Sequence, residues 1–128
     1  MAYYISKSTQ GDFGAVVAKV IEKLKDEGVG VLTEIDVANT LKQKLGVEMK
    51  RYRILGACNP GFAHKALGVE DKIGVMLPCN VIVQEKEAGV IDVAAIDPRT
   101  VMRQIGNPAL DEIAAAVAER LSRVVGAI

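Results

Sequence analysis

The segment IGVMLPCNVIVQEKEAGVIDVAAI, residues 73–96, decides the fold class of this chain. Two apolar runs, 73–85 and 90–96, flank Lys86-Glu-Ala-Gly89, which is typical of the turn in a β-hairpin. Pro78 interrupts the first run, and strand interiors normally exclude proline because it has no backbone N–H to donate. We therefore expect a strand over 73–85 that is kinked or bulged at Pro78 and pairs with a strand over 90–96.

Outward from this hairpin, apolar spacing and capping residues predict the other elements. Residues 13–24 carry apolar side chains at helical spacing after Asp12, a suitable N-cap, and Gly28 suits the left-handed position after that helix. A second long helix is expected over 108–125, and Asx-Pro pairs predict helix starts at Pro60, Pro98 and Pro108. A short helix over 37–45 should pack through Val37, Leu41 and Leu45. Further strands are expected over 3–8, 29–35 and 52–58.

The order of these elements predicts a single α+β domain. A hairpin, together with helices that do not alternate strictly with strands, favours a largely antiparallel sheet. The length of 128 residues corresponds to one domain, here expected over 1–128, and such a chain folds without disulfides or metals.

Composition excludes several classes of function. Lys plus Arg and Asp plus Glu number 16 each, so no long-range field favours nucleic acid or an anionic membrane. The chain has no Trp, two Phe and three Tyr, which leaves no aromatic platform for stacking single-stranded nucleic acid. No stretch approaches the ~20 apolar residues that span a bilayer, and the first residues do not resemble a signal peptide. We expect a cytoplasmic protein that binds neither nucleic acid nor membrane, with both cysteines reduced.

Two segments are candidates for a functional site: Cys58-Asn59-Pro60 and Pro78-Cys79-Asn80. The first joins a strand to a helix start, where free backbone N–H groups favour polar ligands and lower the pKa of a thiol. The second lies at the predicted strand distortion. If the two strands are neighbours, both thiols meet. The same cysteines are also compatible with plain core packing, since cysteine is among the most buried residue types.

His64 is the only histidine and lies on the helix that follows Cys58. Together with Cys58 and Cys79 it would offer two thiolates and an imidazole, but the spacing matches no zinc signature. We therefore predict no metal, include His64 only as a pocket residue, and leave the cofactor unknown.

The sequence resembles the bacterial and archaeal family known as domain of unknown function 302. The matching pieces cover nearly the whole chain: Leu32-Thr-Glu-Ile-Asp36, Leu41-Lys-Gln-Lys-Leu45-Gly46, Ala57-Cys-Asn-Pro60, Ala66-Leu67, Leu77-Pro-Cys-Asn80 and Asp97-Pro98. The resemblance implies a compact α+β domain related to the TATA-binding-protein-like folds, with helices on one face of a curved, largely antiparallel sheet. It also implies small cytosolic proteins that form dimers, and it supplies no activity or catalytic residue.

Three functional hypotheses follow from these observations. The first is a small soluble ligand-binding module, with a small molecule held by Cys58, Asn59, Pro60, His64, Pro78, Cys79 and Asn80. The second is a thiol-based redox sensor or enzyme that uses Cys58 and Cys79. The third is a structural homodimer that acts through a protein partner.

Overall fold

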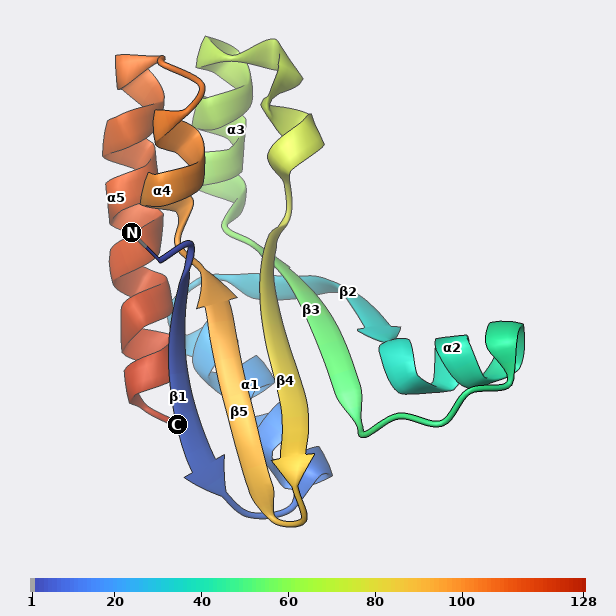
Figure 1. Cartoon of the computed structure of the whole chain (residues 1–128). Helices are drawn as coiled ribbons and strands as arrows, with labels where there is room; N and C mark the ends of the chain where they lie inside the picture. The colour runs from blue at the N-terminus through green and yellow to red at the C-terminus, as the bar shows by residue number, and fades with distance from the viewer. Residues whose placement is uncertain (1) are drawn as a thin grey trace.

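The computed structural model describes residues 2–128, which form one α+β unit built around a single sheet (Figure 1). In chain order the elements are β1 (Tyr4–Gln10), α1 (Phe13–Asp26), β2 (Gly30–Asp36), α2 (Val37–Leu45), β3 (Tyr52–Cys58), α3 (Pro60–Val69), the 3-10 helix η1 (Asp71–Met76), β4 (Cys79–Glu87), β5 (Val90–Ile96), α4 (Pro98–Arg103) and α5 (Pro108–Gly126).

The sheet has five strands in the order β1-β5-β4-β3-β2, and every neighbouring pair is antiparallel. The predicted hairpin is β4–β5, in which Val83 pairs with Val93. The α+β class and the antiparallel sheet are thus confirmed. Asp12 and Asp36 cap α1 and α2 as predicted, and Gly28 adopts a φ of 72° after α1.

The kinked strand predicted over 73–85 is wrong in its first half. Asp71–Met76 forms η1, and β4 begins only at Cys79, directly after a cis Leu77–Pro78 peptide bond. Ile73 is buried whereas Val75 is 83% exposed, so this apolar run does not enter the sheet. A short apolar run does not by itself distinguish a strand from a helical turn.

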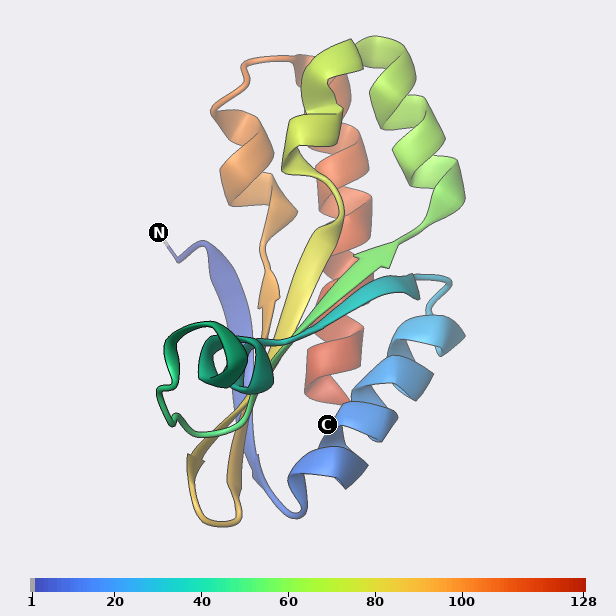
Figure 2. The ribbon, with the colours of Figure 1, turned by 90° about the vertical axis from the view of Figure 1, so that its right-hand side faces the viewer.

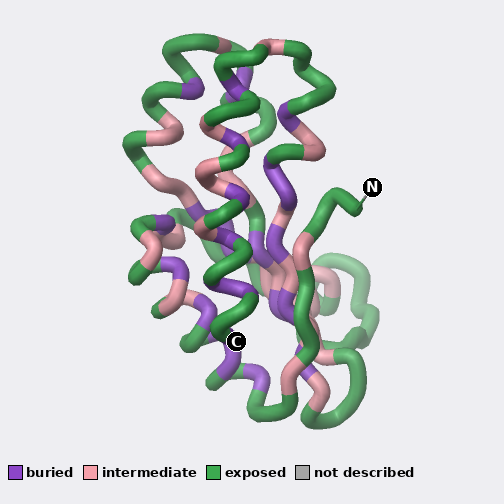
Figure 3. The backbone as a smooth tube through the Cα atoms, turned by 90° about the vertical axis from the view of Figure 1, so that its left-hand side faces the viewer, coloured by how far each residue is buried: buried purple, intermediate pink, exposed green. Residues whose placement is uncertain are grey.

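The main core lies between one face of the sheet, here called the inner face, and helices α1 and α5. Leu55, Val83 and Val93 from the strands meet Leu24 and Leu121 from the helices, all five fully buried. Figure 3 shows the buried parts of the chain concentrated where these helices meet the strands. Alternation along a strand places every second side chain on this face.

A second, smaller core lies beyond the end of the sheet, where α3, η1 and α4 surround the first half of α5 (Figure 1). Its buried members are Ala66, Ile73, Met102, Leu110 and Ala114. Because α5 runs through both cores, it fixes this helical layer relative to the sheet. None of the helices within residues 2–128 combines the length and apolarity needed to cross a membrane.

Helix α2 departs from the prediction that it would pack through Val37, Leu41 and Leu45. It projects from the end of β2, away from α1 and α5 and toward the uncovered face of the sheet (Figure 2). None of its residues is buried, and Leu45 is 69% exposed. The periodicity identified the helix correctly: Val37 and Leu41 are half-buried, and only Leu45 of the three predicted packing residues is exposed.

Candidate functional site

The two cysteine segments meet at the end of the sheet that adjoins the smaller core. Strands β3 and β4 are antiparallel neighbours, and Cys79 pairs with Ala57, the residue before Cys58. Both thiols are free and half-buried. The topology therefore brings together two segments that lie about twenty residues apart in the sequence.

Cys58 and Cys79 line a cavity of about 40 Å³ between the two cores. Its walls come from β3, β4, α3, α4 and α5 and are apolar apart from Asn59 and the two thiols. Small side chains, Ala57, Ala63 and Ala114, leave the space open. An apolar cavity stays dry, and this one is well below the ~150 Å³ that admits benzene, so it accepts only a short apolar group.

A larger groove of about 580 Å³ adjoins the cavity on the outside, between α3 and α5. The groove and the cavity share two wall residues, the half-buried Phe62 and Ile113. Lys65 and Glu112 add opposite charges to the groove. Phe62 and Ile113 therefore lie where the outer groove and the inner cavity adjoin.

The environment of Cys79 disfavours its thiolate. Burial, together with the smaller effect of the neighbouring Cys58, raises the pKa of this thiol from 9.0 to about 11. The thiolate, not the thiol, is the nucleophile in disulfide exchange and alkylation. Cys79 is therefore suited to line an apolar space and poorly suited to act as a nucleophile at neutral pH.

Asn59, at the edge of the cavity, connects the start of α3 to the chain end of α1 through two hydrogen bonds. Its Oδ1 accepts a hydrogen bond from the Phe62 backbone N–H, which caps α3, and its Nδ2 donates to the Gly28 carbonyl at 2.9 Å. Both polar ends of the amide are thus satisfied by the protein itself. Asn59 therefore positions Phe62 and the chain end of α1, and does not offer a free group to a ligand.

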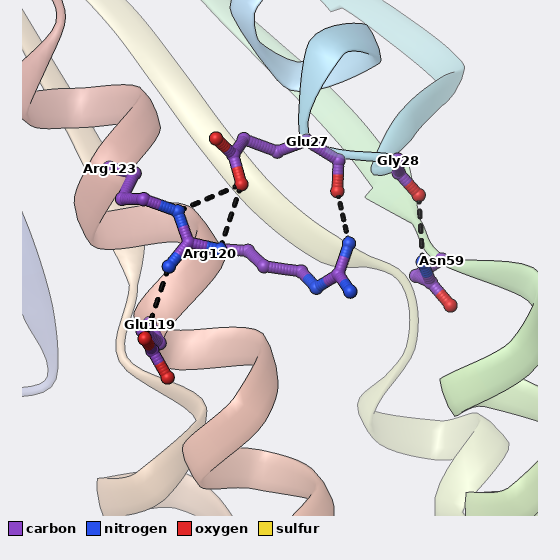
Figure 4. Close-up of polar contacts among 6 residues, drawn as sticks. All are labelled: Glu27, Gly28, Asn59, Glu119, Arg120 and Arg123. Carbon is purple, nitrogen blue, oxygen red and sulfur yellow. Dashed lines mark hydrogen bonds and ion pairs between the residues drawn. The ribbon is translucent and has the colours of Figure 1, made fainter.

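A polar cluster from α5 extends this rim (Figure 4). Arg120 Nη1 donates to the Glu27 carbonyl at 2.6 Å, and the Arg120 guanidinium lies 5.1 Å from the centroid of the Phe62 ring. Arg123 pairs with Glu27 at 2.9 Å and with Glu119 at 3.1 Å, and its hydrogen bond lowers the pKa of Glu27. The cluster fixes α5 against the α1–β2 connection and supports Phe62 from one side.

The other predicted site residues do not line the cavity. Pro60 occupies the first turn of α3, where its missing N–H is not needed, and His64 is exposed on the same helix. Pro78 lies against Gly56, and Asn80 faces a hollow on the opposite face of the sheet. The physical reason is alternation: residues adjacent to Cys79 in an extended chain point to the other side. The structure thus brings together Cys58, Asn59 and Cys79, and not the whole predicted set.

Sequence reasoning did not select Phe62, Ile113 or Arg120 as site residues. Ile113 was visible only as part of the apolar face of α5, which is a packing signal. Phe62 is three residues after the N-cap Asn59, and nothing in the local pattern distinguishes it. Within the described residues, no group of three His, Cys, Asp or Glu side chains lies close enough to hold a metal ion.

Fold and geometry together define a small α+β domain with a narrow apolar cavity between its sheet and a helical layer. The chain belongs to the family described as domain of unknown function DUF302, whose model matches residues 5–128. Among solved structures, it is similar to the crystal structure of the uncharacterized conserved protein DUF302 from Bacillus stearothermophilus, with 28% identity, a TM-score of 0.90 and 98% of each chain covered. No curated protein matches the sequence.

Proposed function

We propose that the protein is a small soluble ligand-binding module whose ligand inserts a short apolar group into the cavity beside Cys58 and Cys79. The observation that carries this proposal is the shared wall between cavity and groove. A ligand of ordinary size fits the groove of about 580 Å³, and its apolar end reaches the inner cavity past Phe62 and Ile113. Binding pockets are typically apolar with few polar groups, as this one is.

The charged residues of the groove indicate which polar portion of a ligand would fit there. Lys65 and Glu112 lie on opposite walls, so a neutral or zwitterionic polar portion is compatible with both. Cys79 contributes apolar contact surface to this site, because its raised pKa keeps the thiol neutral. Cys79 gives the thiol-enzyme hypothesis little support, since that chemistry requires a thiolate at neutral pH.

The test uses 1-hexanol as a probe with an apolar chain and a small polar end. Titrated into the labelled protein, it should shift the amide NMR signals of Phe62, Cys79 and Ile113. Ala63→Phe, which fills the half-buried cavity wall, should abolish those shifts. Ala115→Phe, at an exposed position of α5, is the matched control and should retain them. Equal shifts in both variants, or none in the wild type, would contradict the proposal.

Native mass spectrometry of freshly purified protein adds a second reading of the same site. A retained small molecule that Ala63→Phe loses and Ala115→Phe keeps would identify the natural ligand. We also place this function in the cytoplasm, a proposal supported by the two free thiols, which persist most readily in a reducing compartment.

A further inference from the structure

The face of the sheet opposite the inner face, here called the outer face, carries a hollow of about 530 Å³. Helices α1 and α5 lie on the other side of the sheet and leave this face open (Figure 2). The strand pairing explains the hollow, because the short side chains of Ser6 and Ala94 oppose each other next to the larger pair Tyr4 and Ile96. Binding sites for small molecules measure about 300–1,000 Å³, so the hollow has room for such a molecule.

All three tyrosines of the chain line this hollow. Tyr3 and Tyr4 lie on the β1 side and Tyr52 lies on β3, with β5 and β4 between them. Tyr3 and Tyr4 are 67% and 46% exposed, and their rings meet edge to face with centroids 5.0 Å apart. A tyrosine ring offers a ligand both an apolar face and a polar hydroxyl. The hollow therefore has aromatic surfaces on two opposite sides, which the wide spacing of these residues in the sequence did not indicate.

Hydrogen-bonding groups surround the same hollow. Gln84 Nε2 donates to Asp92 Oδ2 at 3.4 Å, and Ser8 Oγ donates to Asp92 Oδ1 at 3.2 Å, so each oxygen of this carboxylate already accepts a hydrogen bond. Within residues 2–128, the Asn80 amide and the tyrosine hydroxyls of the hollow have no hydrogen-bond partner. A side-chain amide both donates and accepts. The hollow therefore presents donors and acceptors that a bound molecule can use.

We propose that this hollow binds a neutral saccharide. Sugar hydroxyls donate and accept hydrogen bonds, as the Asn80 amide and the tyrosine hydroxyls do, so each can satisfy the other when water is displaced. The C–H faces of a sugar ring are apolar and can pack on the exposed ring of Tyr4. The charges of Lys86 and Asp92 cancel within the hollow, so its overall charge favours a neutral ligand.

The width of the hollow selects a ligand of at least two sugar rings. Neighbouring strands lie about 4.8 Å apart, so β1 and β3, with two strands between them, are separated by about 14 Å. One hexose ring is too small to contact Tyr4 and Tyr52 together, whereas a disaccharide can lie between them. Nucleic acid fits less well, because its phosphates need several basic partners and Lys86 is the only basic residue among the described residues that line the hollow.

Tyrosine fluorescence measures occupancy of the hollow directly, because the chain has no Trp and its three tyrosines all line the hollow. The probes are maltose and cellobiose, two neutral disaccharides of glucose. At least one of them should change the fluorescence in a saturable way and shift the amide NMR signals of Tyr4, Asn80 and Gln84. The signals of Phe62 and Ile113 should not move, because the cavity beside the cysteines shares no described lining residue with the hollow. The proposal is thus independent of the function proposed above.

Variants of two exposed residues locate the binding. Tyr4→Ala removes a ring and Asn80→Ala removes an amide, and each should weaken binding about tenfold. Tyr4→Phe keeps the ring and should bind within about threefold of the wild type. Asn39→Ala, which removes an exposed amide on α2 outside the hollow, is the matched control and should bind as the wild type does. Circular dichroism confirms that each variant is folded.

Three outcomes would overturn the proposal. The first is no saturable response of the wild type to either disaccharide. The second is equal binding by the Asn80→Ala and Asn39→Ala proteins, which would place the sugar elsewhere on the surface. The third is an oligo(dT) strand that binds more tightly than both disaccharides and competes with them, which would assign the hollow to nucleic acid.

Discussion

Replacing Gly56 by alanine tests how the second cysteine segment is positioned. Gly56 lies in β3 opposite Asn80, and a Cβ added there would lie 2.1 Å from Thr33 Oγ1 and 2.8 Å from Pro78 Cγ. Carbon atoms do not approach this closely, so either Thr33 and Pro78 move or the strands separate. Because Pro78 directly precedes Cys79, any movement of Pro78 also displaces Cys79 in the cavity wall.

The expected loss of stability is a balance of two effects. Overpacking of a well-packed site costs about 1–3 kcal/mol. The lower backbone entropy of the unfolded alanine chain returns about 0.4–1 kcal/mol. The net destabilisation should therefore be about 1–2 kcal/mol, which for a domain of this size lowers Tm by roughly 3–10 °C.

Urea unfolding followed by circular dichroism measures this change. Gly30→Ala is the matched control, because Gly30 also lies in a strand but has nothing within 4 Å of the added Cβ. It should leave stability within about 0.5 kcal/mol of the wild type. Thr33→Ala removes the closer of the two obstructing atoms and should recover part of the loss in a double-mutant cycle. A Gly56→Ala protein as stable as the wild type would refute the reasoning.

Three further predictions address the site and its supports. At pH 7 a pKa of about 11 instead of 9.0 leaves about 100-fold less Cys79 thiolate, and because a more basic thiolate is also more nucleophilic, alkylation should be about 10-fold slower than for an ordinary thiol. Mass spectrometry of peptides after timed labelling measures this, and rapid labelling would contradict the buried environment. Asp97→Ala removes the α4 cap and the partner of Arg99, so urea unfolding at pH 7 should show a loss of about 1–2 kcal/mol. The Arg99 hydrogen bonds lower the pKa of Asp97 in the folded protein, so the stability that Asp97 contributes should be fully present above its unfolded pKa of about 3.9. That stability should be lost as the pH falls through the lower pKa of the folded state. A destabilisation by Asp97→Ala that is the same at pH 2 as at pH 7 would contradict this reasoning. Asn59→Ala leaves the Gly28 carbonyl without its side-chain donor and α3 without its cap, and should cost about 1–2 kcal/mol in the same assay, whereas Asn59→Asp should retain the cap and lose only the hydrogen bond to Gly28.

Elements with strong local signals were predictable from the sequence. The bounds of α2, β3 and β5 match the prediction, and α1 begins where Asp12 indicated. β1 extends to Gln10, beyond the predicted end at Ser8, because it pairs with β5 along its whole length. This extension depends on tertiary pairing, which the polar residues at its end do not reveal.

The candidate site was only partly predictable from the sequence. The sequence left open whether β3 and β4 are neighbours, because α3 and η1 separate them along the chain; in the structure they pair and bring Cys58 and Cys79 to one cavity. Phe62 and Ile113 line the cavity together from helices about fifty residues apart in the sequence, and no periodicity in either helix specifies this. His64 and Asn80 were grouped with the cysteines by sequence proximity, but helix rotation and strand alternation point them elsewhere.

Strands β3 and β4 separate the cavity from the opposite, outer face of the sheet. Ala57 and Cys79 line the cavity on the inner face, while their sequence neighbours Gly56 and Asn80 pair on the outer face. The cavity wall and the outer face are therefore opposite sides of the same strand pair, one residue apart. Protein interiors are close-packed, so a displacement on one side of such a pair is felt on the other. Ligand binding in the cavity should consequently weaken in Gly56→Ala, whereas Gly30→Ala should leave it unchanged.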